Sequence, residues 1–65
     1  MLETNNFIAR VGVDLEGNKQ FYIHEKNQHN LQLTNNNIEF YHSACGAVNT
    51  HKEAIKIMKI FESNN

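Results

Sequence analysis

The chain lacks three features that would direct it to a particular partner or compartment: paired cysteines, a large net charge and a long apolar run. Its one cysteine, Cys45, cannot form an internal disulfide, and an unpaired cysteine suits a reducing compartment. The net charge is -1, so no large basic field attracts nucleic acid. No stretch approaches the ~18 apolar residues that span a bilayer, and residues 1–6 lack the basic start and apolar run of a secretory signal. We therefore expect a cytoplasmic protein without a membrane segment.

The length of 65 residues indicates one small domain over residues 1–65. A domain of this size buries only about 60% of the surface that its unfolded chain exposes, so its core is small. Because no disulfide framework is present, we expect a protein partner or self-association to supplement the core. We expect residues 1–6 to form a flexible N-terminus and residues 63–65 a frayed C-terminus.

The clearest local signal is a helix that starts after Thr50. Thr50 and Glu53 have the spacing of a capping box, in which the threonine hydroxyl accepts from the backbone N–H of Glu53 and the carboxylate reaches back to the N–H of Thr50. The apolar residues that follow at helical spacing are Ala54, Ile57, Met58 and Phe61. Ile60 lies outside this stripe. A basic ridge on the same helix is formed by Lys52, Lys56 and Lys59.

Two segments with alternating apolar residues, 7–15 and 19–26, predict a β-hairpin. A two-residue loop at Gly17 and Asn18 would scatter the apolar side chains. A three-residue loop over 16–18, with Asn18 in the left-handed region, instead pairs the apolar residues with one another. These predicted pairs are Val13 with Phe21 and Val11 with Ile23. The opposite face then carries Arg10, Gly12, Asp14, Tyr22 and His24.

Residues 38–45 fit two interpretations. As a strand from Ile38 to Ala44, they place apolar side chains on one face and supply the third strand that a stable sheet needs. As a helix, they have Asn37 as cap, a buried stripe, and Gly46 as the left-handed terminator. The helical stripe consists of Tyr41, Ala44 and Cys45. We favour the strand, and so expect an α+β fold: a three-stranded antiparallel sheet, in β-β-β-α order, packed by one C-terminal amphipathic helix.

Histidine and cysteine offer a loose metal-ligand pattern. The candidate ligands are His24, His29, His42 and Cys45, whose spacing imitates small zinc modules. In the strand interpretation His42 and Cys45 point to opposite faces, so we favour no metal and no cofactor. A cysteine nucleophile would need a nearby base such as His42 or His51, and no flanking pattern supports one. Cys45 is better read as a small apolar residue, and we expect no enzymatic activity.

Protein binding is the function that the remaining surface favours. The outer sheet face and one helix flank carry residue types common at interfaces, and an exposed edge strand offers free backbone donors and acceptors. The candidate partner-binding residues are Arg10, Tyr22, His24, Tyr41 and Ile60. The same surfaces also suit a homodimer. An alternative is a nucleic-acid-binding accessory protein that uses the outer sheet face or the lysine ridge.

In size and plan, the chain resembles small phage-encoded proteins that inhibit host enzymes or defence complexes, such as anti-CRISPR proteins. The resemblance covers the whole chain and rests on no shared motif. It implies a short protein of the host cytoplasm that combines a sheet with a helix and acts by occluding a surface. The expected function is therefore an inhibitor or adaptor of a larger complex.

Overall fold

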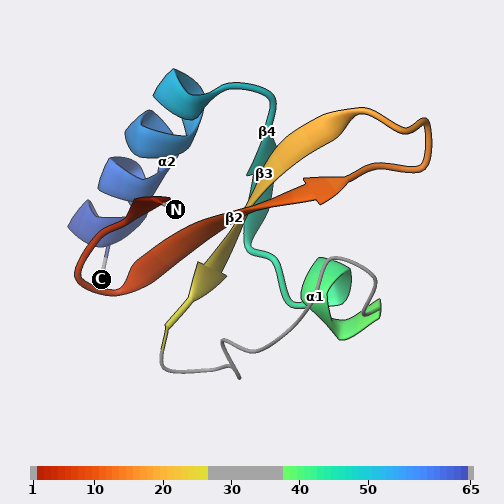
Figure 1. The fold of residues 1–65 in the computed structure, drawn as a ribbon. Helices are drawn as coiled ribbons and strands as arrows, with labels where there is room; N and C mark the ends of the chain where they lie inside the picture. The colour runs from red at the N-terminus through yellow and green to blue at the C-terminus, as the bar shows by residue number, and fades with distance from the viewer. Residues whose placement is uncertain (1, 27–37, 65) are drawn as a thin grey trace.

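The computed structural model describes residues 2–26 and 38–64, with the side chains of residues 38 and 39 left aside. A four-stranded antiparallel sheet runs in the order β1-β2-β3-β4. The elements are β1 (Leu2–Glu3), β2 (Phe7–Val13), β3 (Lys19–Glu25), α1 (Ile38–His42), β4 (Gly46–Val48) and α2 (His51–Ser63) (Figure 1). The predicted α+β class is confirmed, with four strands in place of three.

The predicted strand from Ile38 to Ala44 is wrong. Residues Ile38–His42 form α1, and the strand beside β3 is Gly46–Val48. A short apolar segment fits both the two-residue period of a strand and the 3.6-residue period of a helix, and tertiary contacts decide between them. Here the helix buries Phe40 completely against the sheet, with Tyr41 and Ala44 packed partly beside it. The helical alternative differs in detail, since Cys45 is exposed and Gly46 does not adopt a positive φ.

The hairpin register differs by two residues from the predicted one. Val11 lies opposite Phe21 and Ala9 opposite Ile23, which leaves residues 14–18 as the connection. The carboxylate of Asp14 sets this longer turn, because its Oδ1 accepts from the N–H groups of Glu16 (2.9 Å) and Asn18 (2.8 Å). The positive φ of 87° falls on Gly17 instead of Asn18. A shift of two residues preserves the faces, so the predicted grouping of side chains still holds.

Helix α2 begins at the predicted cap and buries the predicted stripe. The Thr50 Oγ1 accepts from the N–H of Glu53 at 3.1 Å, and the Thr50 hydroxyl donates to the Glu53 carboxylate, also at 3.1 Å. Ala54 and Met58 are buried. They form the main core with Phe7, Ala9 and Ile23, and Ile57 and Phe61 pack partly against it.

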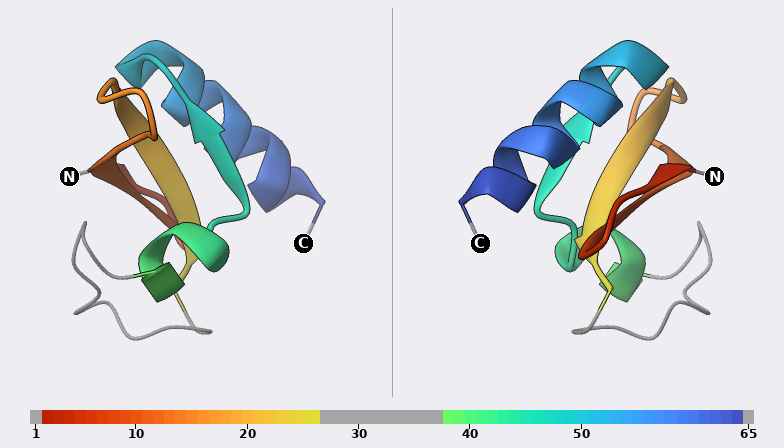
Figure 2. Two further views of the ribbon diagram at one scale, coloured as in Figure 1. Left: turned by 90° about the vertical axis from the view of Figure 1, so that its right-hand side faces the viewer. Right: turned by 90° about the vertical axis from the view of Figure 1, so that its left-hand side faces the viewer.

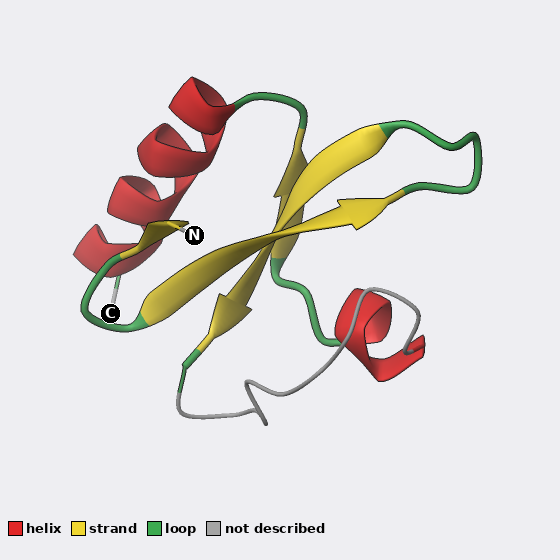
Figure 3. Ribbon diagram, in the orientation of Figure 1, coloured by secondary structure: helices red, strands yellow, loops and turns green. Residues whose placement is uncertain are grey.

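The other face of the sheet carries a smaller apolar cluster, beneath α1. Phe40 packs edge-on against Tyr22, with ring centroids 5.5 Å apart, and Tyr41 packs against both rings at 5.0 Å. Gly12 lies under these rings and leaves space for them. The sheet therefore stands between α2 on one face and α1 on the other (Figures 2 and 3).

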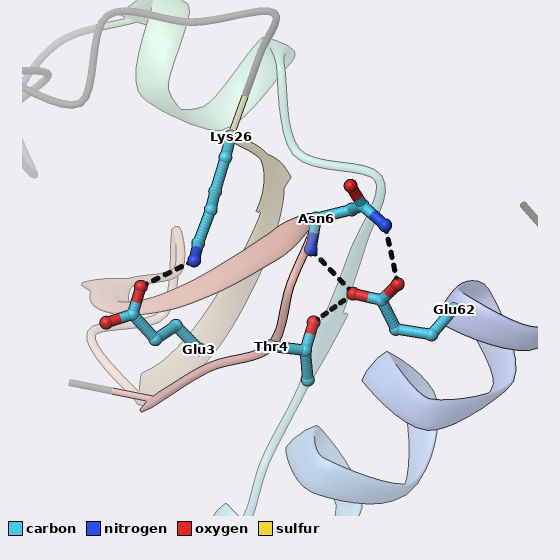
Figure 4. A network of polar contacts seen from close by, with 5 residues as sticks. All are labelled: Glu3, Thr4, Asn6, Lys26 and Glu62. Carbon is cyan, nitrogen blue, oxygen red and sulfur yellow. Dashed lines mark hydrogen bonds and ion pairs between the residues drawn. The ribbon is translucent and has the colours of Figure 1, made fainter.

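The N-terminal segment, expected to be flexible, is attached to β2 on one side and to the end of α2 on the other. Leu2 and Glu3 pair with Ala9 and Ile8 of β2. The carboxylate of Glu62, near the end of α2, accepts from the Thr4 hydroxyl (2.5 Å) and from the N–H and side-chain amide of Asn6 (both 2.7 Å). Glu3 also forms an ion pair of 2.6 Å with Lys26 (Figure 4). At the other terminus, α2 continues through Ser63, and residue 65 lies outside the described residues.

Candidate protein-binding surface

The outer part of the β2–β3 hairpin, residues 11–20, projects away from α2 as an arm (Figure 1). We call it the hairpin arm. Val11 and Val13 are each 44% exposed, and Leu15 in the turn is 107% exposed, as open as in an extended chain. Val11 and Val13 lie two positions apart in β2 and so share one face of the sheet, and Leu15 follows them in the turn. We call this row the apolar stripe.

The apolar stripe continues a buried row of the same strand. Phe7 and Ala9 precede it on the same face and lie in the core under α2. Helix α2 begins beside Phe21, whose ring lies 6.2 Å from that of His51, and Phe21 pairs with Val11. Because α2 begins at His51, beside the Val11–Phe21 pair, the helix does not extend over Val13 or the turn that follows it. The uncovered length of the strand carries the apolar stripe.

The opposite face of the hairpin arm is supported by α1. The Tyr41 hydroxyl accepts from the N–H of Val13 at 3.4 Å. Just before the arm, the guanidinium carbon of Arg10 lies 5.6 Å from the centre of the Phe40 ring, within the range of a cation–π contact. One face of the arm is therefore packed, while the face with the apolar stripe is open.

Two predicted contact residues, Tyr22 and His24, are not on the surface. They are 8% and 2% exposed, because α1 covers the sheet face that the sequence analysis expected to be open. His24 packs against Phe40, with ring centroids 4.8 Å apart, and its Nδ1 lies 3.2 Å from Ser43 Oγ. The burial of both residues corrects the prediction of an outward contact face there.

The other predicted contact residues do not form one surface. Arg10 is half-buried beside α1, Tyr41 is a half-buried residue of α1, and Ile60 is 45% exposed on α2. Ile60 lies near the end of α2 that contacts Phe7 and Asn6, far from the tip of the hairpin arm. The ridge residues Lys52, Lys56 and Lys59 are all exposed on α2.

The predicted metal ligands are separated in the described part of the chain. His24 is buried beneath α1, His42 and Cys45 are exposed, and His29 lies outside the described residues. Among residues 2–26 and 38–64, no three or more His, Cys, Asp or Glu side chains gather at one point. Desolvation and the Glu25 carboxylate raise the pKa of the Cys45 thiol, whereas a nucleophilic cysteine needs a lowered pKa.

The alternation of residues 7–15 predicts a half-buried strand and does not single out Val11, Val13 and Leu15 as exposed. No local signal separates these residues from the buried residues that precede them, because their exposure depends on where α2 begins relative to β2.

None of the helices described here combines the length and the apolar character needed to cross a membrane. Comparison of the chain with known protein families, with curated proteins and with solved structures gave no match.

Proposed function

We propose that the protein is a non-enzymatic protein-binding module that acts as an inhibitor or adaptor, and that the apolar stripe of the hairpin arm is its contact surface. The observation that carries this proposal is the exposure of Val11 and Val13 on one face of β2 and of Leu15 in the turn that follows, beyond the start of the helix that covers the rest of the strand. Contiguous exposed apolar side chains on a small protein mark interaction surfaces more often than isolated ones do.

The hairpin arm is held in place before any partner arrives. The Asp14 carboxylate organises the turn through Glu16 and Asn18, and its Oδ2 also accepts from the side-chain amide of Gln20 at 3.0 Å. Tyr41 supports the arm from behind, at Val13. An ordered surface loses little conformational entropy on association, so its apolar area converts more fully into affinity.

Polar residues border the apolar stripe, as they do at the rim of typical interfaces. Lys19 pairs with Val13 across the hairpin and is exposed, and Glu16 is exposed beside Leu15. A surface with an apolar centre and a charged rim favours a protein partner over a lipid phase.

The test is capture of a partner from host lysate on the immobilised protein, followed by affinity measurement with the purified partner. Val13→Glu places a charge in the stripe and should weaken binding at least about tenfold, since it exchanges buried apolar area for a buried charge. Ile60→Glu is the matched control, because Ile60 and Val13 have almost equal exposed fractions at opposite ends of the molecule. Equal affinities of the wild type and Val13→Glu would reject the stripe as the contact surface.

The alternative of nucleic-acid binding rests on the exposed lysines of α2. In that case a labelled oligonucleotide should bind with an affinity that falls steeply with salt, because phosphate contacts release counterions. Replacement of Lys52, Lys56 and Lys59 by glutamine should then abolish binding, while Val13→Glu should leave it unchanged.

A further inference from the structure

A groove separates the N-terminal segment from α2. It encloses about 260 Å³ and is lined by Leu2, Glu3, Thr4, Ile55, Met58 and Lys59. This volume is smaller than the ~300–1,000 Å³ of sites for drug-sized ligands, so it suits a side chain better than a cofactor. Leu2, Ile55 and Met58 make its apolar part, and an aliphatic side chain is the group that fits such a lining.

The charged rim of the groove favours an acidic neighbour beside that aliphatic group. Glu3 is already neutralised by Lys26, whose Nζ lies 2.6 Å from its carboxylate. Lys59 is exposed and makes no ion pair with any residue that the structure describes. The groove therefore presents one available positive charge next to an apolar floor.

The same chain carries the complementary group at the tip of the hairpin arm. Leu15 is the most exposed large apolar residue described, and Glu16 follows it with an exposed carboxylate. The Asp14 side chain, on the other side of Leu15, is occupied within the turn. An exposed leucine followed by a glutamate matches an apolar groove bordered by a lysine in both shape and charge.

We propose that two copies of this chain associate reciprocally, with Leu15 of each copy inserted into the groove of the other and Glu16 paired with Lys59 across the contact. The tip of the hairpin arm lies toward one end of a molecule whose longest dimension is 31 Å, and the N-terminal segment and α2, whose residues line the groove, lie toward the other end (Figure 1). Two copies side by side in opposite directions bring each tip to the other copy's groove. A two-fold axis then generates both contacts and closes the assembly as a dimer.

The experiment is sedimentation equilibrium of the full chain from micromolar to millimolar concentration. The wild type should form a reversible dimer. Leu15→Ser should weaken it about a hundredfold or more, because the symmetric dimer loses two buried leucines. Leu15 lies in an exposed turn, so this substitution does not threaten the fold. A wild-type monomer at millimolar concentration, or larger assemblies in place of dimers, would overturn the proposal.

Exchanging the charges of Glu16 and Lys59 tests independently whether these two side chains meet across the contact. Glu16→Lys and Lys59→Glu should each weaken the dimer, and the double variant should restore it. Lys52→Glu is the matched control, since it makes the same change about 10 Å away, at the start of α2. A dimer that survives Lys59→Glu, or a double variant that stays as weak as the single ones, would overturn the contact.

Dimer formation goes beyond the proposed function, and the two can be tested separately. Lys59→Glu alters the groove and leaves the apolar stripe intact. It should therefore weaken the dimer without reducing capture of a different protein, whereas Val13→Glu should affect capture.

Discussion

Gly12 is the glycine at which an added methyl group would meet the closest neighbours. A Cβ atom at this position would lie 2.8 Å from Cδ2 of Tyr22 and 2.9 Å from Cε1 of Phe40. Both neighbours belong to the small cluster beneath α1, and Phe40 is fully buried, so neither ring moves without disturbing others. The close approach of the strand to these rings explains why glycine occupies the last position but one of β2.

Gly12→Ala should therefore destabilise the protein by about 1–3 kcal/mol, the usual range for overpacking. The control is Gly46→Ala in β4, where the added Cβ would meet Cζ and Cε2 of Phe61 at 3.6 Å and 3.8 Å, which are ordinary contacts. That substitution should be neutral or slightly stabilising, because alanine lowers the entropy of the unfolded chain. Urea unfolding monitored by circular dichroism measures both. A Gly12→Ala variant as stable as Gly46→Ala would contradict this packing argument.

Among the elements, α2 has the strongest local start signal. Thr50 accepts the N–H of Glu53 and no other side chain satisfies that donor among the described residues. Thr50→Ala should lower the free energy of unfolding by about 0.5–2 kcal/mol. Ser63→Ala, which removes a hydroxyl bonded to the Ile60 carbonyl at the other end of the helix, is the control and should cost less. Both values come from the same urea titration, and the reverse order would contradict the cap.

We expect the link between the N-terminal segment and α2 to weaken as the pH falls. The hydrogen bond from Thr4, followed by those from Asn6, lowers the pKa of Glu62 from its ordinary value of 4.5. A lowered carboxylate pKa adds stability that is complete above the ordinary value and is lost as pH falls through the folded value. Glu3 and Asp14 act in the same direction, since their pKa values are also lowered.

Glu62→Gln should reduce the urea midpoint near neutral pH and flatten its decline below about pH 4.5, because less proton-linked stability remains to be lost. A series of urea midpoints against pH, taken for the wild type and for Glu62→Gln, measures both effects. An unchanged pH profile in Glu62→Gln would show that this carboxylate does not hold the N-terminal segment.

Sequence patterns predicted the elements that interactions between residues close in the sequence determine. The cap at Thr50, the stripe of α2 and the alternation of β2 and β3 are short-range patterns, and each appears in the structure. The register of the hairpin was missed because it depends on the hydrogen bonds of one side chain, Asp14. Residues 38–48 were missed because burial of Phe40 against Tyr22, a contact between distant residues, selects helix over strand.

The candidate site was harder to predict than the fold for the same reason. The exposure of Tyr22 and His24 depends on the position of α1. The exposure of Val11 and Val13 depends on where α2 begins relative to β2. Alternation identifies which residues share a face, but not which face is covered.

At the scale of the whole molecule, the two faces of the sheet are unequally anchored. Helix α2 is fixed by Ala54 and Met58 in the main core and by the Glu62 bonds at its end. Helix α1 has five residues, and Phe40 is its fully buried anchor. We therefore expect α1 to open while the sheet and α2 remain folded, which would transiently expose Tyr22 and His24.

Native-state hydrogen exchange tests this order of opening. Amides of α1 and Ala44 should exchange through an opening of lower free energy than amides of β2 and β3. Phe40→Leu removes contacts that are lost both when α1 alone opens and when the whole protein unfolds, so it should reduce the protection of all these amides. Met58→Val removes contacts that persist when α1 alone opens, so it should reduce protection in β2, β3 and α2 and leave the α1 opening unchanged. Both truncations are milder than the alanine substitutions that cost about 2–5 kcal/mol, which keeps the variants folded. If Met58→Val lowers the protection of α1 by the same amount as that of β2, the two faces open together and the sheet is a single cooperative unit.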